Sequence, residues 1–211
     1  FDNTDRKPIT VKVALSAVST EGALKNLKAE AEGLTFEQAR AKNEALWEKE
    51  LACIDVEGSE DQKAMIYTSL YHTLINPSIY MDVDRKYLRV DGNIHEAKDF
   101  DNYTIFSVWD TYRAEHPFLQ LVKPEHNLNM VKSMIAHQQQ NRLHMLPVWS
   151  LMGNEGWCMT GYHAVTVVAD ALVKGAALNA DEALRAMDET ANCSIRQRQD
   201  SSIQHTRVLI R

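Results

Sequence analysis

The chain has few cysteines and no long apolar run, and both absences exclude whole classes of protein. Its three cysteines, Cys53, Cys158 and Cys193, are odd in number and far apart, whereas a disulfide framework or a zinc site needs closer, paired spacings. No stretch approaches the roughly 18 consecutive apolar residues of a membrane-spanning helix. We therefore expect free, mostly buried thiols and no membrane span.

An excess of positive charge is also lacking. The 211 residues include 23 Lys and Arg against 29 Asp and Glu, a formal net charge of −6, so no nucleic-acid partner is expected. A Gly-rich phosphate loop and a Gly-x-Ser-x-Gly nucleophile turn are absent as well. The hydrophobic content of 45% is typical of a globular protein with a sizeable core.

The N-terminal segment has the pattern of a β-strand. Apolar side chains alternate with others at Ile9, Val11, Val13 and Leu15, which is the two-residue period of a half-buried strand. Because a lone strand cannot bury its face, we predict that residues 9–15 are the last strand of a β domain whose other strands lie outside the chain. The first residue is Phe1 and no signal-peptide pattern follows it, so we expect the chain to begin within a longer protein.

Most of the remaining sequence has helical periodicity. Ser19 or Thr20 can cap a helix that ends near Glu32, and Thr35 with Gln38 has capping-box spacing at the start of a second helix. Further helical patterns cover residues 61–76, 109–121, 128–140, 162–174 and 181–190. Residues 78–105 and 146–160 are predicted to be elaborate loops of functional importance. Helices of about 12 residues joined in this way favour an α/α hairpin array or toroid.

The most informative segment is residues 106–117, which contains Trp109 next to Asp110. An indole can cover the apolar face of a sugar ring, while a neighbouring carboxylate accepts hydrogen bonds from two adjacent hydroxyls. The alternative is structural: Ser107 and Asp110 have capping-box spacing, so Asp110 could instead satisfy the backbone N–H groups of a helix start.

A second candidate segment, residues 149–163, places Glu155 between two tryptophans and two glycines. A desolvated carboxyl group there could act as a general acid or bind a sugar. Alternatively, Glu155 is a first-turn acid favoured by the helix dipole, and His163 is a hydrogen-bonded core imidazole.

Other polar residues give weaker signals. Four of them, Asp82, Asp84, Asp91 and Asn93, could suggest calcium, but the spacing lacks the closing glutamate of an EF-hand loop and favours turns. The histidines His126, His137 and His144 lack the spacing of metal ligands and are predicted to lie at the surface.

Seven segments in order resemble glycoside hydrolase family 92. They are residues 106–113 (FSVWDTYR), 116–117 (HP), 130–134 (MVKSM), 146–149 (LPVW), 153–155 (GNE), 158–163 (CMTGYH) and 169–175 (ADALVKG). Residues 16–30 and 67–72 are similar to the family as well, so the resemblance covers about residues 9–190.

The resemblance implies an exo-acting, inverting, calcium-dependent α-mannosidase with an N-terminal β-sandwich and a C-terminal (α/α)6 toroid, secreted or periplasmic, whose partners are mannose-containing glycans. The expected fold is mainly α, the first part of that toroid preceded by the last strand of the sandwich. The expected domains are the sandwich tail (1–18), linker helices (19–58), a partial toroid (59–192) and a divergent or disordered tail (193–211).

The resemblance also assigns residues. Trp109 and Asp110 match the position at which the family binds the terminal mannose, and Arg113, Asn154 and Glu155 are expected to bind substrate beside them. The family's catalytic acid and base lie in Glu-Gly-Asn-x-Trp-Gln and Gly-(Asn/Asp)-x-Asp-x-Gly-Gln segments, which do not occur here. We therefore expect the missing remainder of the catalytic domain to supply them, with Glu155 as a weak candidate within this chain.

Two alternatives remain open from the sequence. The chain could be another (α/α)6 glycosidase, of the glucoamylase-like kind, with Asp110 and Glu155 as its acid–base pair. It could also be a helical binding module without catalytic activity.

Overall fold

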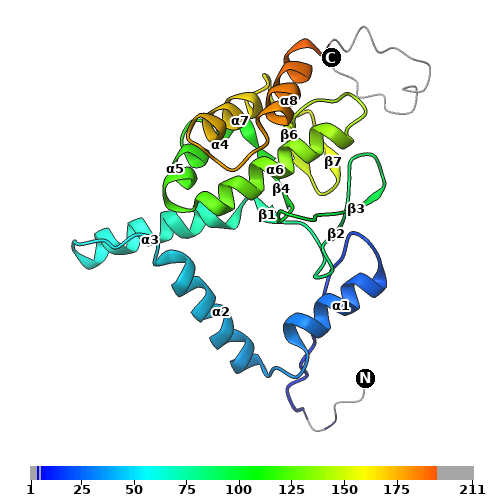
Figure 1. Cartoon of the computed structure of the whole chain (residues 1–211). Coiled ribbons are helices and arrows are strands. Elements are labelled where there is room, and N and C mark those ends of the chain that lie inside the picture. The colour runs from blue at the N-terminus through cyan, green and yellow to red at the C-terminus, as the bar shows by residue number, and fades with distance from the viewer. Residues whose placement is uncertain (1–3, 5, 194–211) are drawn as a thin grey trace.

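The computed structural model of the chain describes residue 4 and residues 6–193 (Figure 1). This part is mainly helical, as predicted. The helices are α1 (Thr20–Ala31), α2 (Phe36–Leu51), α3 (Glu60–Ile75), α4 (Val108–Thr111), α5 (Glu115–Val122), α6 (Pro124–Gln140), α7 (Ala164–Val173) and α8 (Ala180–Asn192). The strands are β1 (Ser78–Ile79), β2 (Lys86–Leu88), β3 (Ile94–Glu96), β4 (Tyr103–Thr104), β5 (Phe106–Ser107), β6 (Trp149–Leu151) and β7 (Asn154–Glu155).

Helix α6 forms the centre of the hydrophobic core. It packs against α5, α7, α8 and β4, and Figure 1 shows it crossing the middle of the helical body. Its residues 133–138 are all buried, as expected for a helix covered on every side. The buried cluster around it comprises mainly Phe106, Leu119, Val131, Met134, Leu146, Val168 and Ala186.

The two loops predicted between helices contain short antiparallel strands. Strand β1 pairs with β4 and β2 with β3, whereas β5, β6 and β7 form a three-stranded sheet. In that sheet Ser107 lies opposite Trp149, and Ser150 lies opposite Glu155. The sheet therefore brings the two candidate segments together, although about 40 residues separate them in sequence.

The helix predicted over residues 109–121 is interrupted. The structure has α4 and then α5, with residues 112–114 between them outside the helical assignment. Pro117 explains the break, since its ring lacks an N–H and clashes with the carbonyl of residue 113 in a continuous helix. Proline is tolerated in the first turn of a helix, where its N–H is not needed, and here it occupies the first turn of α5.

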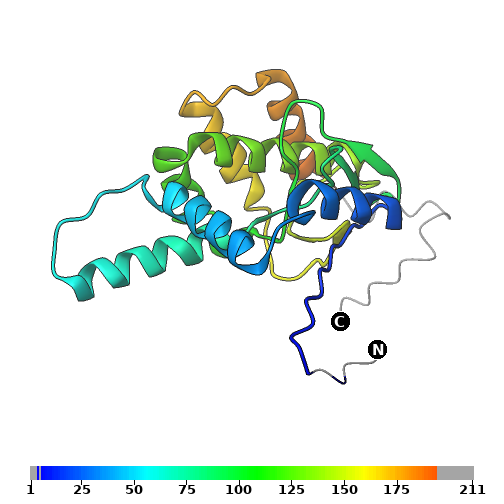
Figure 2. The ribbon, with the colours of Figure 1, turned by 90° about the horizontal axis from the view of Figure 1, so that it is seen from below.

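The N-terminal arm, which we define as residues 6–75, packs loosely. Figure 1 shows α1 and α2 lying apart from the helical body, and Figure 2 shows α3 projecting from it. Helix α1 is nevertheless docked by polar contacts: the buried carboxylate of Asp82 accepts hydrogen bonds from Ser16 (2.7 Å) and Asn26 (2.8 Å). Gly22 lies against the same carboxylate, where a Cβ atom would come within 2.2 Å of Asp82 Oδ2.

Residues 9–15, predicted to be the last strand of a β domain, form no strand within the described structure. These residues adopt neither helix nor strand, and the four apolar side chains are 58–83% exposed. The reason is that the seven strands within the described residues all pair with one another, which leaves residues 9–15 without a partner strand. The predicted tail at 193–211 lies outside the described residues except for Cys193.

The cysteines are free, as predicted. Cys53 and Cys193 are half-buried, whereas Cys158 is exposed, contrary to the expectation of mostly buried thiols. Across the described helices, none combines the length and hydropathy that crossing a membrane requires.

Candidate functional site

Trp109 and Asp110 lie at the surface on the short helix α4. The Trp109 side chain is 38% exposed, and Asp110 is exposed as well. The capping alternative for Asp110 is not realised, because α4 has no side-chain cap hydrogen bond. Instead, the hydroxyl of Ser107 donates a hydrogen bond to Oδ2 of Asp110. Both predicted sugar-binding groups are therefore accessible.

A hydrogen-bond chain connects Asp110 to the second candidate segment. The indole Nε1 of Trp149 donates to the Ser107 hydroxyl at 2.8 Å, and that hydroxyl contacts Asp110. The backbone N–H of Trp149 in turn donates to Oε1 of Glu155 at 2.8 Å. The structure thus links three residues predicted from separate motifs.

Glu155 is buried, at 7% exposure. Besides Trp149, its carboxylate accepts hydrogen bonds from the backbone N–H groups of Val148 (3.1 Å) and Trp157 (3.0 Å). Burial raises the pKa of Glu155, and these backbone donors partly oppose the rise. The first-turn interpretation is wrong, since Glu155 ends a strand and α7 begins nine residues later. Through these three hydrogen bonds, the Glu155 side chain holds the backbone of residues 148–157 in its folded conformation.

His137 was predicted to lie at the surface, but it is buried. It lies on α6, and its Nε2 is 3.5 Å from Oε2 of Glu155. Burial, helped by nearby Arg89, lowers the pKa of His137 to about 3. The imidazole is therefore neutral, and its contact with Glu155 is not an ion pair. His126 is part-exposed beside Glu50, and His144 is exposed.

Arg113 contributes to a surface cluster of rings beside Asp110. Its guanidinium carbon lies 5.5 Å from the centre of the Trp109 ring and 5.2 Å from that of Tyr112. The Tyr112 ring stacks on His163 with centroids 4.3 Å apart and planes 7° apart. His163 is half-buried and is not the core imidazole of the alternative. Such rings, with a cation above them, form a surface suited to a sugar ring.

Glu115 is a residue that the sequence analysis missed. It begins α5, and its Oε1 is buried with no hydrogen-bond partner. Burial, with a smaller contribution from Asp110, raises the pKa of Glu115 to about 7. The sequence indicated Glu115 only by its position five residues after Asp110. Its burial could not be predicted, because a glutamate in the first turn of a helix is usually exposed.

Asn154 remains exposed at the start of β7, and its Oδ1 accepts a hydrogen bond from the backbone N–H of Glu155 at 3.0 Å. Asp91 binds the backbone N–H of Asn93 at 2.8 Å, the turn contact expected for it. Among the described residues, no group of three or more His, Cys, Asp or Glu side chains is placed to hold a metal ion.

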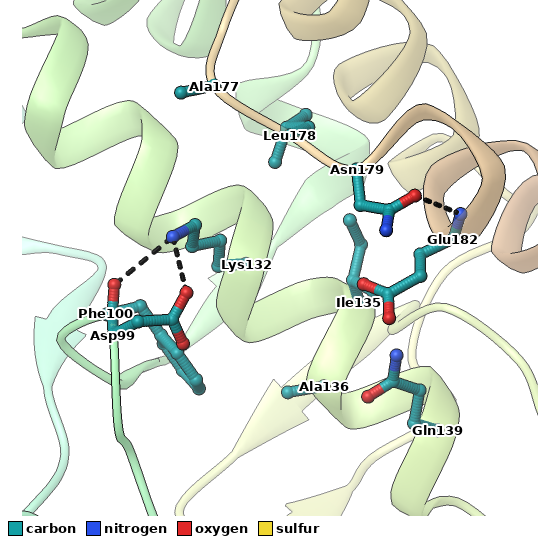
Figure 3. Close-up of a pocket in the computed structure, with 10 residues that line it drawn as sticks. All are labelled: Asp99, Phe100, Lys132, Ile135, Ala136, Gln139, Ala177, Leu178, Asn179 and Glu182. Atoms are coloured by element: carbon teal, nitrogen blue, oxygen red, sulfur yellow. Dashed lines mark hydrogen bonds and ion pairs between the residues drawn. The ribbon is translucent and has the colours of Figure 1, made fainter.

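Two surface hollows lie elsewhere. Figure 3 shows one, of about 210 Å³, where Lys132 of α6 pairs with Asp99 and Asn179 accepts the N–H of Glu182 at the start of α8. The other, of about 250 Å³, lies beside Trp47. Neither is lined by Trp109, Asp110, Arg113, Asn154 or Glu155.

Sequence comparison defines the class of protein. The glycosyl hydrolase family 92 catalytic domain matches residues 22–209, which extends past residue 190, where the resemblance of individual motifs ends. The chain belongs to glycosyl hydrolase family 92. No match was found among the curated proteins compared.

Solved structures agree with this assignment. The family 92 α-mannosidase BT3965 from Bacteroides thetaiotaomicron is 49% identical, with a TM-score of 0.83 over 85% of this chain, and one of its structures is a complex with mannoimidazole. The inverting mannosidase BT2199 from the same organism is 30% identical, with a TM-score of 0.75 over 82% of this chain. The glycosyl hydrolase ccman5, at 22% identity and a TM-score of 0.70, shares the fold. The chain spans about a quarter of the length of these relatives.

Proposed function

We propose that the chain is part of an inverting, calcium-dependent exo-α-mannosidase that removes terminal α-mannose from glycans. The observation that carries the proposal is the exposed Trp109–Asp110 pair, oriented by Ser107, in a family 92 chain. Its support from relatives is the 49% identity to an α-mannosidase whose structure contains mannoimidazole.

In this proposal the sugar ring lies on the indole of Trp109 and its hydroxyls reach Asp110. Oδ2 of Asp110 already accepts the Ser107 hydroxyl, while Oδ1 has no partner among the described residues. A carboxylate carries about four acceptor sites, so two adjacent sugar hydroxyls can bind at once. Arg113, above the rings of Trp109 and Tyr112, provides donors at the edge of the same surface.

Catalysis requires more than this surface. An inverting glycosidase places a carboxylic acid and a second carboxylate about 6.5–9.5 Å apart, with a water at one of them. Glu155 is a poor candidate for either role, because it is buried and occupied by three backbone N–H groups. We infer that the acid and base are supplied by the remainder of the catalytic domain, so that this chain alone is inactive.

The wider architecture is part of the proposal. Residues 9–15, with their exposed apolar side chains, would complete an N-terminal β-sandwich, and the helical body would form the first part of an (α/α)6 toroid. Calcium in such an enzyme would bind and orient the ring of the terminal mannose. Because no group of three or more His, Cys, Asp or Glu among the described residues is placed to hold a metal ion, we assign no calcium ligand to this chain. A periplasmic or secreted location is proposed by resemblance.

The test compares the 211-residue chain with the full-length protein that carries it, on an aryl α-mannoside with added calcium. We expect turnover by the full-length protein, release of mannose with inverted anomeric configuration, loss of activity with a chelator, and none from the chain alone. Turnover by the isolated chain would contradict the inactivity, and hydrolysis of α-glucosides without α-mannosides would favour the glucoamylase-like alternative.

A further inference from the structure

We propose that Ser107 and Trp149 are positioning residues that hold the Asp110 carboxylate in its sugar-binding orientation. The proposal rests on the function proposed above, since it concerns the same carboxylate. Ser107 Oγ is the centre of the arrangement: the Trp149 indole donates to it at 2.8 Å, and it contacts Oδ2 of Asp110.

The chemistry of the three groups determines the direction of each hydrogen bond. An indole N–H can only donate, and an ionised carboxylate can only accept. A serine hydroxyl has a single hydrogen to donate. Because the carboxylate can only accept, the hydroxyl hydrogen is directed to Asp110, while the indole of Trp149 binds an acceptor site of the same oxygen. Trp149 therefore positions the Ser107 hydroxyl, and Ser107 restrains Asp110.

Asp110 needs such a restraint because little else holds it. Its side chain is exposed and sits on a four-residue helix that lacks a side-chain cap. A freely rotating carboxylate would lose rotamer freedom on binding sugar, and that loss weakens affinity. A charge-assisted hydrogen bond from Ser107 orders the carboxylate before the ligand arrives and leaves Oδ1 available.

The β-sheet holds both positioning residues in place. Ser107 and Trp149 lie directly opposite each other in paired strands β5 and β6. The backbone of Trp149 is held in turn by the buried carboxylate of Glu155 at 2.8 Å. Glu155 therefore acts on the sugar site through Trp149 and Ser107, without contacting the ligand.

The test measures the Kd of mannoimidazole and kcat/KM for an aryl α-mannoside in the full-length protein. We expect Ser107→Ala to weaken binding about tenfold, the value of one lost hydrogen bond to a charged group. Ser107→Thr, which keeps the hydroxyl, should bind within about twofold of the wild type. Trp149→Phe should resemble Ser107→Ala.

A double-mutant cycle separates positioning from general stability. Asp110→Ala should itself weaken binding strongly, and adding Ser107→Ala to it should change Kd by less than about twofold, since the serine acts through Asp110. An additive effect of Ser107→Ala, or no effect of Ser107→Ala alone, would overturn the positioning role. If Asp110→Ala binds like the wild type, the proposed function itself fails. If Trp149→Phe does not fold, the alanine and threonine variants of Ser107 decide.

Discussion

The helical body and the N-terminal arm are held in place by different physical means. In the body, a cluster of fully buried apolar side chains surrounds α6. In the arm, residues 6–75, Leu70 is the one buried hydrophobic side chain among those described, and α2 has no buried residue at all. Burial of apolar area is the main source of folding free energy, so the body contains most of the stability.

Apart from Leu70 and the partly buried Leu74, which packs against the core, the arm depends on a small number of polar contacts. Asn26 and Ser16 bind Asp82, and Lys123 of the body contacts Glu50 of α2 at 2.8 Å. Surface ion pairs contribute only about 0–1 kcal/mol each. We therefore expect the candidate site, which lies on the body, to keep its local order when the arm opens.

The largest expected effect is a core truncation in the body. Leu119 is 0% exposed, and Leu119→Ala should lower the free energy of unfolding by about 2–5 kcal/mol through lost burial and a cavity. Phe36→Ala in the arm, where the ring is 68% exposed, should change it by less than about 1 kcal/mol. Urea unfolding of both variants checks the contrast, and equal losses would refute it.

The next effect concerns the buried carboxylate. Glu155→Ala leaves three backbone N–H groups without their acceptor and should destabilise the body by about 2–3 kcal/mol. Glu57→Ala removes an exposed glutamate of the arm and should cost less than about 0.5 kcal/mol. Thermal unfolding measures the stability of both variants. A Glu155→Ala protein as stable as the Glu57→Ala control would contradict the role of Glu155 in stabilising residues 148–157.

A smaller effect depends on pH and involves Glu115. Its folded pKa of about 7 lies above the ordinary value of 4.5, so the protonated form is favoured in the folded state. The stability that this confers is full below about pH 4.5 and is lost as the pH rises through 7. Glu115→Gln should therefore match the wild type at about pH 4 and be more stable by about 1–2 kcal/mol at about pH 8, a figure reduced for solvent screening.

The check for Glu115 is urea unfolding at both pH values. Glu48→Gln on the exposed surface of α2 controls for the change in net charge. A difference between Glu115→Gln and the wild type that does not vary with pH would show that the carboxyl group is not held protonated.

The smallest effect is local to the arm. Asn26 donates to Asp82 and to the carbonyl of Leu15, and accepts from the N–H of Val83. Asn26→Ala should speed hydrogen exchange of α1 amides about fivefold, a loss of about 1 kcal/mol, while α6 amides stay unchanged. Faster exchange of α6 amides as well would mean that the arm and the body unfold together.

Local signals in the sequence predicted the helices well. The caps predicted at Ser19 and Thr35 are both present in the structure, because capping depends on residues only two or three positions apart. The break after α4 was missed, although Pro117 was the signal. The alternation at residues 9–15 predicted a strand, but pairing requires a second strand that the pattern cannot supply.

The candidate site was predicted only in part. Trp109 and Asp110 were identified from an aromatic next to a carboxylate, and the structure leaves both exposed. The contacts of Glu155 and the burial of His137 depend on the pairing of β6 with β7 and on the packing of α6. The bond from Trp149 to Ser107 spans 42 residues. Tertiary contacts of this kind leave no periodic trace in the sequence.

The most direct measurement is a crystal structure of the full-length protein bound to mannoimidazole. The account predicts that the sugar-like ring lies against the indole of Trp109, with the Asp110 carboxylate within about 2.5–3.2 Å of two adjacent hydroxyls. A ligand bound elsewhere, with Asp110 making no contact to it, would contradict the central claim.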